Sequence, residues 1–501
     1  MNLTLLFSAL VLTVGSRTPQ QPVESARALL GHLIDAINAK DESKLRDFVS
    51  AWTPSNVPIE VRLQRWGDLG KHGAPFKLVG EGRETDSEVD GIVTSDEGSR
   101  LVFTLHITKQ PSLRISSLVV RPAYVVEGPP SEFANWTTLN SLARAIADSA
   151  KAPAMGIAMM RDGKLTVGVS GIRKLNEHDA VQPNDVWSIG SIGKSICCTV
   201  IGALIERGKL RWEETLAEAL PGLTMDSGYR KVTLEQLMHH RGGVPQDLGF
   251  TDARVDELAG DAKTPTAQRE RYAKDILSRK PIAAPGEQFA YSNAGYALLS
   301  VIAERARGKP YEALVHDFIF RPLHLRHSYT DADDLPKTRP SGHIEEGSSL
   351  VAHNMTGPIE AMLAGAGGGL FMSLGDLATY GAAHMKGLRG QDGLLKAATI
   401  ARLHQGIPEI PNGRLYACGW TSETVPSLEP FDGHNGSNGT MRSQVAIFPG
   451  AGLVVVGIAN RGGEFEPAPG FIAVMAVAQR YAASSVQVPV RPPTQVSATQ
   501  R

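Results

Sequence analysis

The stretch Trp187–Thr199 reads WSIGSIGKSICCT and holds Ser191-Ile192-Gly193-Lys194, the only SxxK sequence in the chain. Residues three apart share one face of a helix, so the Lys194 amine is predicted to lie within reach of the Ser191 hydroxyl. A serine hydroxyl becomes a good nucleophile when a neighbour takes its proton, and an unprotonated lysine can do so. The start of the same helix offers backbone N–H groups to a developing oxyanion. Apolar residues at helical spacing predict a buried face for this helix: Ile192, Ile196, Val200, Ile201, Leu204 and Ile205.

A phosphate-binding loop is the alternative for the same residues, because Gly193-Lys194-Ser195 looks like the end of such a loop. That loop requires GxxxxGK and therefore a glycine at position 188. The residue there is Ser188, so the pattern does not fit.

A second motif, Tyr291-Ser292-Asn293, is the only YxN sequence in the chain. A tyrosine beside a lysine ionises more readily, so Tyr291 is a candidate to act as a general base and then return the proton. Asn293 is a candidate to hold a substrate carbonyl or side chain. The structural alternative is a tyrosine that only begins the apolar helix that follows.

A third motif, His434-Asn435-Gly436-Ser437, has the form HxG, which also occurs at His240 and His404. The copy at His434 stands apart because the strand-like residues Ser443–Phe448 follow it closely. A glycine in an edge strand lets the strand approach a substrate, and the Ser437 N–H is a candidate second oxyanion donor.

In this order, SxxK, YxN and HxG resemble the serine β-lactamase and penicillin-recognising hydrolase superfamily. The similarity is to the branch with class C β-lactamases, D-Ala-D-Ala carboxypeptidases, D-aminopeptidases and family VIII carboxylesterases. It covers about Leu139 to Ala483. Landmark stretches also match that branch: Leu237–Pro245, Gly367–Leu370 followed by Ser373–Leu377, and Arg414–Trp420.

The resemblance implies an acyl-enzyme mechanism. Ser191 would be the acylated nucleophile, and Lys194 and Tyr291 would share proton transfer, with the acylation base open between them. Backbone N–H groups of Ser191 and Ser437 would form the oxyanion hole. The implied substrate-binding residues are Asn293, His434, Gly436 and Ser437.

The chain departs from true β-lactamases at His434, a position that is often lysine in a Lys-Thr-Gly strand. That lysine offers a fixed cation to the carboxylate of penicillins and peptidoglycan stems, whereas histidine is a weaker, pH-dependent cation. Arg442 is a candidate to compensate. HxG also occurs in esterase and peptidase members, so the motifs favour cleavage of esters or amides, of esterase or D-amino-acid peptidase type. The alternatives are a β-lactamase or penicillin-binding DD-peptidase, and a non-catalytic binding or sensor protein that retains the fold.

Other reactive residues point to no additional chemistry. The chain has three cysteines, too few for a disulfide framework, and they are predicted to be small buried side chains. His324 and His327 have ligand-like spacing without a third ligand, so we expect no metal and no cofactor. His239 and His240 are neighbours that would point apart on a helix. No GxSxG surrounds the candidate nucleophile, which disfavours an α/β-hydrolase fold.

Secondary-structure patterns predict an α+β, multidomain chain. Helical spacing over Val23–Val49 precedes alternating strands at Leu101–Ile107 and Leu113–Val120, which indicates a small N-terminal α+β domain. Its stretch Ala36–Asp41 resembles the cone-shaped fold of the nuclear-transport-factor-like superfamily, whose members include enzymes and binding modules, so it implies no activity.

The larger unit is predicted to be an antiparallel sheet flanked by helices, with a mostly helical lobe from Ser191 to about Arg321. Strands from both ends of this unit could join one sheet. The predicted elements outside the lobe are helix Leu139–Ser149, strand Ala154–Met160, a turn at Asp162-Gly163, strand Leu165–Val169, strands Gln444–Phe448 and Leu453–Ala459, and helix Phe471–Ala482.

The ends of the chain suggest export. The apolar run Leu3–Gly15 is shorter than the ~20 residues of a membrane span and fits a secretory signal peptide, which predicts a secreted or periplasmic protein. A buried first helix is the alternative. The predicted organisation is a signal peptide at 1–16, the small α+β domain at 22–125, a linker at 126–138, the hydrolase-like domain at 139–483 and a flexible tail at 484–501.

Overall charge sets limits on partners. The chain has 501 residues, with 51 Lys and Arg against 52 Asp and Glu, which gives a formal net charge of −1. Nothing in this balance suggests a nucleic acid or an acidic membrane surface as a partner. The expected partner is a small-molecule or peptide substrate, with no nucleic acid and no membrane span. The sequence leaves the oligomeric state and the role of residues 22–125 open.

Overall fold

A computed structural model describes residues 25–483 with internal gaps, and the chain divides into two compact units, Met1–Val125 and Val126–Arg501. The predicted signal peptide and tail lie outside the described residues. The gaps are 54–58, 60–62, 64–65, 67–74, 85–87, 96–99, 109–112, 123–130, 246–251, 332, 348, 354–356, 409–414, 424, 426–427 and 464–466.

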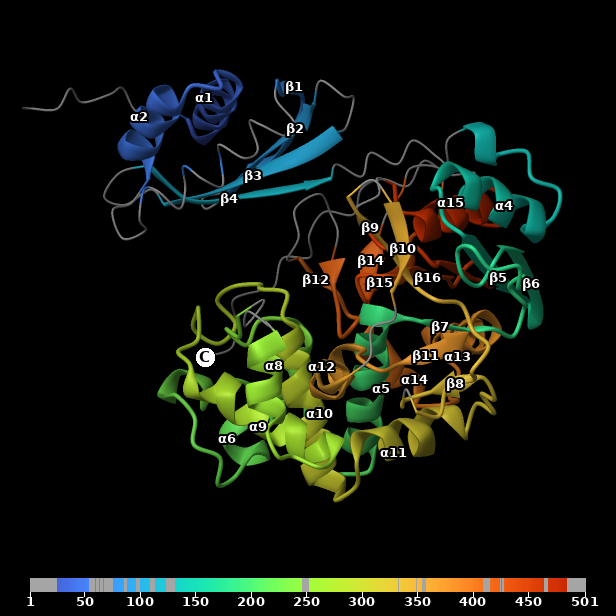
Figure 1. The fold of residues 1–501 in the computed structure, drawn as a ribbon. Coiled ribbons are helices and arrows are strands. Elements are labelled where there is room, and N and C mark those ends of the chain that lie inside the picture. Colours follow the sequence, from blue (N-terminus) through green and yellow to red (C-terminus); the bar gives the residue numbers. More distant parts are fainter. Residues whose placement is uncertain are drawn as a thin grey trace, which may run out of the picture. The chain divides into compact units, whose positions relative to one another are not determined.

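The described part of the first unit includes the helices α1 and α2 and an antiparallel sheet, drawn in blue in Figure 1. Lys40, at φ +50°, interrupts the helical conformation between the two helices. Asp41 then caps the second helix by accepting the Ser43 and Lys44 N–H groups. The sheet lies in the order β1-β2-β3-β4. The elements are α1 (Ala26–Asn38), α2 (Glu42–Trp52), β1 (Lys77–Glu84), β2 (Glu88–Thr94), β3 (Arg100–Thr108) and β4 (Arg114–Pro122).

This unit has its own core, because Leu29 and Leu33 of α1 cluster with Val89 of β2 and Phe103 of β3. The two predicted strands correspond to β3 and β4. The sequence did not reveal β1 and β2, whose Gly80 and Gly91 interrupt the apolar alternation. The likeness to the nuclear-transport-factor-like fold stays a prediction.

The second unit is built on a sheet that, within the described residues, has eight strands in the order β12-β13-β14-β15-β16-β17-β5-β6. Val456 of β17 pairs with Ala158 of β5, so strands from both ends of the unit join, as predicted. The strands are β5 (Ala154–Arg161), β6 (Lys164–Gly171), β12 (Ile407–Pro408), β13 (Leu415–Tyr416), β14 (Thr421–Glu423), β15 (Phe431–Ser437), β16 (Arg442–Phe448) and β17 (Leu453–Ala459).

Helices cover both faces of this sheet (Figure 1). Alternation along β17 explains why: Val455 packs in the cluster of α4 (Leu139–Ser149) and α15 (Pro469–Tyr481), whereas Val454 and Val456 pack in the cluster on the other face. Helix α13 (Leu374–Leu388) lies on that other face. Strands buried on both sides read as continuous apolar runs, which is how the sequence shows β17.

Part of the predicted linker packs into this unit. Phe133 is 3% exposed and belongs to the core cluster of α4 and α15. The Trp136 indole donates to the Ala476 carbonyl (3.2 Å), and the Arg480 guanidinium lies over the Trp136 ring. Residues 131–138 therefore contribute side chains to the unit that follows them.

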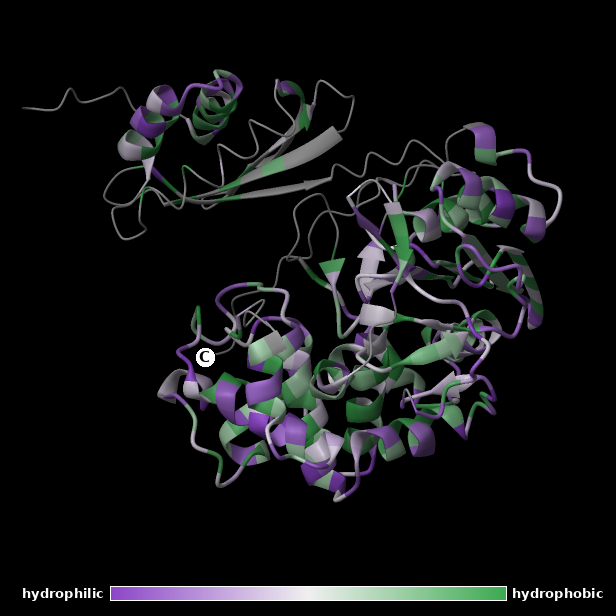
Figure 2. Cartoon of the chain, viewed as in Figure 1, coloured by the Kyte–Doolittle hydropathy of each residue, from purple (hydrophilic) through white to green (hydrophobic). Residues whose placement is uncertain are grey.

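The remaining described elements form the helical lobe and two small sheets, β7-β11-β8 and β9-β10. Helix α5 is buried along its length from Gly193 to Leu204 rather than on one face only, because α10, α11 and α14 pack against it. Figure 2 shows its apolar character beside the hydrophilic residues of α9. The elements are β7 (Val186–Ser188), α5 (Gly193–Glu206), α6 (Leu216–Ala219), α7 (Leu234–Met238), α8 (Asp252–Ala259), α9 (Pro265–Ser278), α10 (Asn293–Arg307), α11 (Tyr311–Val315), β8 (Ser328–Tyr329), β9 (His343–Glu346), β10 (Ser349–Ala352), α12 (Pro358–Met362), β11 (Phe371–Ser373) and α14 (Ala397–Leu403).

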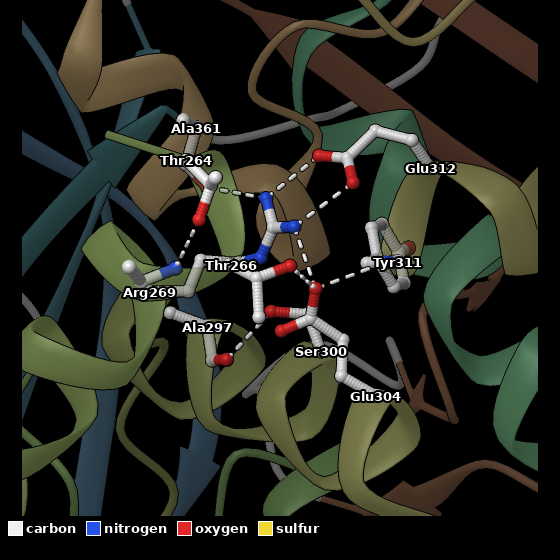
Figure 3. Close-up of polar contacts among 10 residues, drawn as sticks. Thr264, Thr266, Arg269, Ala297, Ser300, Glu304, Tyr311, Glu312 and Ala361 are labelled. Atoms are coloured by element: carbon white, nitrogen blue, oxygen red, sulfur yellow. Dashed lines mark hydrogen bonds and ion pairs between the residues drawn. The ribbon is translucent and has the colours of Figure 1, made fainter. Parts of the chain in front are cut away.

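A buried arginine joins four helices of the lobe (Figure 3). Arg269 on α9 donates to Glu304 of α10 (2.7 Å) and to Glu312 of α11 (2.7 and 2.9 Å). It also donates to the Ala361 carbonyl of α12 (3.0 Å). Because its side chain has no solvent exposure, these bonds replace the hydration of its two terminal nitrogens. Arg269 therefore ties α12 to α9, α10 and α11.

No helix in the described part of the chain is long and apolar enough to cross a membrane.

Candidate active site

The SxxK serine lies on a tight turn between β7 and α5. Gly190 has φ +50°, a conformation that favours glycine, and it opens the 3-10 turn Gly190–Ile192 that carries Ser191. A Cβ at Gly190 would lie 2.5 Å from the Ser437 nitrogen. The turn therefore brings the partly exposed Ser191 against the end of β15.

The Lys194 amine lies beside the candidate nucleophile, as the helical spacing predicts. Its Nζ is 3.0 Å from Ser191 Oγ, 2.7 Å from Asn293 Oδ1 and 3.3 Å from the Ala366 carbonyl oxygen. Lys194 is 0% exposed, and all three oxygens around it are uncharged. The Tyr291 ring also faces the amine, with its centroid 4.7 Å from Nζ.

The YxN motif forms the start of α10. Ser292 is the helix N-cap, and its hydroxyl accepts the Gly295 N–H (3.0 Å), which turns Asn293 toward Lys194. Tyr291 is half-buried, and its hydroxyl makes no hydrogen bond to any residue that the structure describes. The motif thus brings Tyr291 and Asn293 to Lys194, with the Tyr291 ring rather than its hydroxyl facing the amine.

Strand β15 passes directly beside the nucleophile turn. A Cβ at Gly436 would overlap the Ile189 carbonyl oxygen, so this close approach requires glycine. The Ser443 hydroxyl of β16 donates to the same carbonyl (2.8 Å) and fastens the strand to the turn. His434, on the same strand, is 2% exposed. Arg442 donates instead to the Gly463 carbonyl (2.8 Å).

Two residues that we did not single out as site residues complete the surroundings of Tyr291. The Tyr416 hydroxyl lies 3.2 Å from His434 Nε2 and 3.1 Å from His240 Nε2. The Ser292 N–H donates to His240 Nδ1 (3.0 Å). The His240 ring centroid is 4.4 Å from that of Tyr291. Both residues fall within the landmark stretches 237–245 and 414–420, which was the only signal available in the sequence.

His239 and His240 lie just beyond the end of a helix. Helix α7 ends at Met238, and His240 takes a left-handed conformation with φ +58°. His239 Nδ1 contacts the Glu235 carbonyl (2.9 Å), so the two rings do have different partners. The turn, rather than helical periodicity, aims His240 at the site.

A second series of hydrogen-bonded, buried polar side chains ends at Thr199 of α5. His404 contacts Asp432 (2.9 Å) and His384 (2.9 Å), and His384 contacts Thr199 of α5 (3.1 Å). Burial lowers the pKa of His384 well below its usual value, with repulsion from His404 as a second cause. None of these groups contacts the Ser191 or Lys194 side chain.

Metal and thiol chemistry find no support in the described part of the chain. No group of three or more His, Cys, Asp or Glu side chains could hold a metal ion there. The three cysteines Cys197, Cys198 and Cys418 are free and buried, as predicted. Burial raises the pKa of Cys197 and of Cys198, which disfavours the reactive thiolate.

Comparison with known proteins agrees with this geometry. A family model described as Beta-lactamase matches residues 139–479. The chain belongs to the Beta-lactamase family. This confirms the resemblance inferred from SxxK, YxN and HxG, and the predicted fold of the larger unit. Residues 1–138 lie outside the match.

Relatives in the Beta-lactamase family are distant but cover most of the second unit. Penicillin-binding protein 4 of Amycolatopsis lactamdurans is 26% identical over 326 residues, 62% of this chain and 81% of that protein. A Beta-lactamase of Pseudomonas fluorescens is 24% identical over 341 residues, 61% of this chain and 88% of that protein. A solved structure, an octameric penicillin-binding protein homologue from Pyrococcus abyssi, is 27% identical with a TM-score of 0.56, and the match covers 67% of this chain and 75% of that one.

Proposed function

We propose that the chain is a serine hydrolase that cleaves esters or amides through an acyl-enzyme on Ser191. The observation that carries this proposal is the buried Lys194 amine, 3.0 Å from the Ser191 hydroxyl and surrounded by uncharged oxygens. Membership of a family of serine hydrolases supports the same reaction class.

The contacts of Lys194 suit a base. An unprotonated amine has two N–H bonds, which the Asn293 and Ala366 oxygens would accept, and one lone pair, which would accept the Ser191 proton. Attack of Ser191 Oγ on the carbonyl carbon transfers that proton to Nζ. The Tyr291 and Tyr296 rings, 4.7 and 5.6 Å from Nζ, would stabilise the ammonium that forms.

The backbone beside Ser191 supports an oxyanion hole. The start of the helix supplies the Ser191 N–H, and the Ser437 nitrogen lies against Gly190. Collapse of the tetrahedral intermediate expels the leaving alcohol or amine, which takes up the proton from Lys194 directly or through Tyr291. Water then attacks the acyl-enzyme and gives one proton to the same relay, which passes it to Ser191 Oγ as the acyl–oxygen bond breaks and the acid leaves.

Within the family, we propose an esterase or D-amino-acid peptidase rather than a β-lactamase or DD-peptidase. His434 stands where a lysine would offer a permanent cation to a substrate carboxylate, and Arg442 binds the Gly463 carbonyl. The alternative is a β-lactamase or penicillin-binding DD-peptidase, and it is supported by relatives named penicillin-binding protein and Beta-lactamase.

Intact mass after incubation with a fluorophosphonate tests the nucleophile. Wild type should gain one adduct, and Ser191→Ala none. Ser195→Ala, which removes a buried serine one turn along the same helix, is the matched control and should keep the adduct. Absence of an adduct on wild type would favour the non-catalytic binding or sensor alternative. Rates on short esters, D-amino-acid amides and β-lactams would then separate the activities.

We also propose that the protein is secreted or periplasmic, on the basis of the apolar segment 3–15. N-terminal mass analysis of exported protein would test this, because cleavage near residue 16 is expected. An uncleaved N-terminus would contradict it.

A further inference from the structure

A chain of hydrogen bonds joins the HxG strand to the YxN motif. It runs from the Ser292 N–H through His240 and the Tyr416 hydroxyl to His434, and ends at the Asn435 carbonyl. All the side chains in it are buried. Because one end is a backbone donor and the other a backbone acceptor, the position of every proton in the chain can be assigned.

The assignment begins at His240. A backbone N–H can only donate, so His240 Nδ1 accepts from Ser292 and carries no proton. A neutral imidazole must then carry its proton on Nε2, which donates to the Tyr416 hydroxyl oxygen (3.1 Å). A second proton on His240 would break the bond to Ser292.

The assignment continues to His434. The Asn435 carbonyl can only accept, so His434 Nδ1 carries a proton and donates to it (2.5 Å). Tyr416 receives the His240 proton and directs its own hydroxyl proton to His434 Nε2 (3.2 Å). His434 therefore has one nitrogen that donates and one that accepts, which is the neutral form.

The surroundings of His240 favour its neutral form. His240 is faced by Lys194 of α5, His434 of β15 and His239 after α7, and by the rings of Tyr291, Tyr296 and Tyr416. Burial, the largest cause, lowers the pKa of His240 well below its usual value, so its Nδ1 stays able to accept from Ser292. The Tyr296 hydroxyl donates to the Met238 carbonyl (2.6 Å), so its proton is not available to Tyr416.

We propose that Tyr416 is a positioning residue that holds His434 uncharged, so that the site selects substrates without a carboxylate beside the scissile bond. The inference rests on the proposed function and narrows its substrate class. His434 lies three residues before Ser437 on the strand that flanks the nucleophile turn, where a positive charge would attract an anionic substrate. With a neutral His434, a carboxylate bound there would lose hydration without gaining an ionic partner.

The test compares two esters that differ only in charge: 3-(butanoyloxy)benzoate and its methyl ester. For wild type, kcat/KM for the methyl ester should exceed that for the acid by about tenfold or more. This ratio should stay constant between pH 8 and pH 5.5, because the Tyr416 hydroxyl proton is directed at His434 Nε2 and leaves no lone pair there for a second proton.

Tyr416→Phe removes the donor to His434 and the acceptor of His240. His434 can then take up a proton, so the preference for the methyl ester should fall about fivefold between pH 8 and pH 5.5. Tyr229→Phe is the matched control: it also removes a buried tyrosine hydroxyl, but one without a hydrogen-bond partner among the described residues. Its ratio should equal that of wild type at every pH.

The outcomes distinguish a failure of the inference about Tyr416 and His434 from a failure of the proposed hydrolase function. Equal rates on the two esters, or a wild-type ratio that falls with pH, would overturn the inference and leave the proposed function standing. A Tyr416→Phe ratio as flat as that of wild type would also overturn it. Hydrolysis of neither ester would overturn the proposed function and this inference together. If Tyr416→Phe does not fold, the wild-type pH dependence still decides.

Discussion

Replacement of Arg269 by methionine should strongly destabilise the second unit. The substitution keeps an unbranched side chain of similar length but removes the cation from Glu304, which is 6% exposed, and from Glu312, which is 23% exposed. The Ala361 carbonyl also loses its donor. Among the described residues, the Glu304 carboxylate then keeps hydrogen bonds from the Thr266 hydroxyl and the Tyr311 N–H and has no cation.

The burial of this ion pair determines how much free energy of unfolding the substitution should cost. Breaking a buried ion pair by removing one partner costs about 3–5 kcal/mol, because the remaining charge is buried without compensation. An unpaired buried carboxylate is relieved when it takes up a proton, so the difference from wild type should narrow as the pH is lowered toward 5. Adding Glu304→Gln to Arg269→Met should recover part of the loss for the same reason.

Urea unfolding of the full chain, followed by circular dichroism at pH 7.5 and pH 5.5, measures both effects. Arg279→Ala is the control, since Arg279 pairs with Asp275 (3.1 Å) at the end of the same helix but is 40% exposed. Its cost should stay below about 1 kcal/mol. An Arg269→Met cost as small as that of Arg279→Ala, or a cost independent of pH, would refute the view that burial makes this ion pair matter.

Three further predictions concern the site and its electrostatics. Gly436→Ala should lower kcat by about 10²-fold or more in ester hydrolysis, because the added Cβ pushes β15, and with it the Ser437 N–H, away from the Ile189 carbonyl. An unchanged kcat would contradict the assignment of the Ser437 N–H to the oxyanion hole. Below pH ~6.5 the unfolded chain protonates its histidines, whereas folded His384, with its lowered pKa, stays neutral. The free energy of unfolding should therefore decrease as the pH is lowered below ~6.5, and His384→Gln should make this decrease smaller by up to about 1.4 kcal/mol per pH unit in urea titrations. Burial raises the pKa of Glu360 to about 7, so ionising it costs stability as the pH rises above ~4.5; Glu360→Gln should add about 3 kcal/mol at pH 8 and nothing at pH 4, and an equal gain at both would contradict the assignment.

Much of the fold is readable from local sequence because local and global preferences agree. Helix α4 was predicted with its observed ends, since Thr138 caps its start and its apolar residues recur on one face. Strands β16 and β17 were recognisable because strands buried on both faces are continuously apolar. The sequence did not reveal strands β1 and β2, because glycines and charged residues interrupt their alternation; the pairing of β1 with β2 and of β2 with β3, together with the core under α1, defines them.

The site was predictable only where spacing along one element determines it. The closeness of Ser191 and Lys194 follows from one helical turn. The meeting of Tyr416 with His240 and His434 does not, because it joins a two-residue strand, a left-handed turn and a third element far apart in sequence. The ring-first orientation of Tyr291 toward Lys194 likewise depends on tertiary packing.

The pairing of β17 with β5 has a consequence for how the chain acquires its fold during synthesis. The hairpin β5–β6 leaves the ribosome early, but the strand that covers its open edge is encoded about three hundred residues later. Until then, the edge of β5 presents unpaired backbone groups and apolar side chains, the features that promote aggregation of nascent chains. Ser437, which flanks the nucleophile turn, also emerges late. Folding of this unit should therefore be slow, and chains truncated before β17 should depend on chaperones and show no activity.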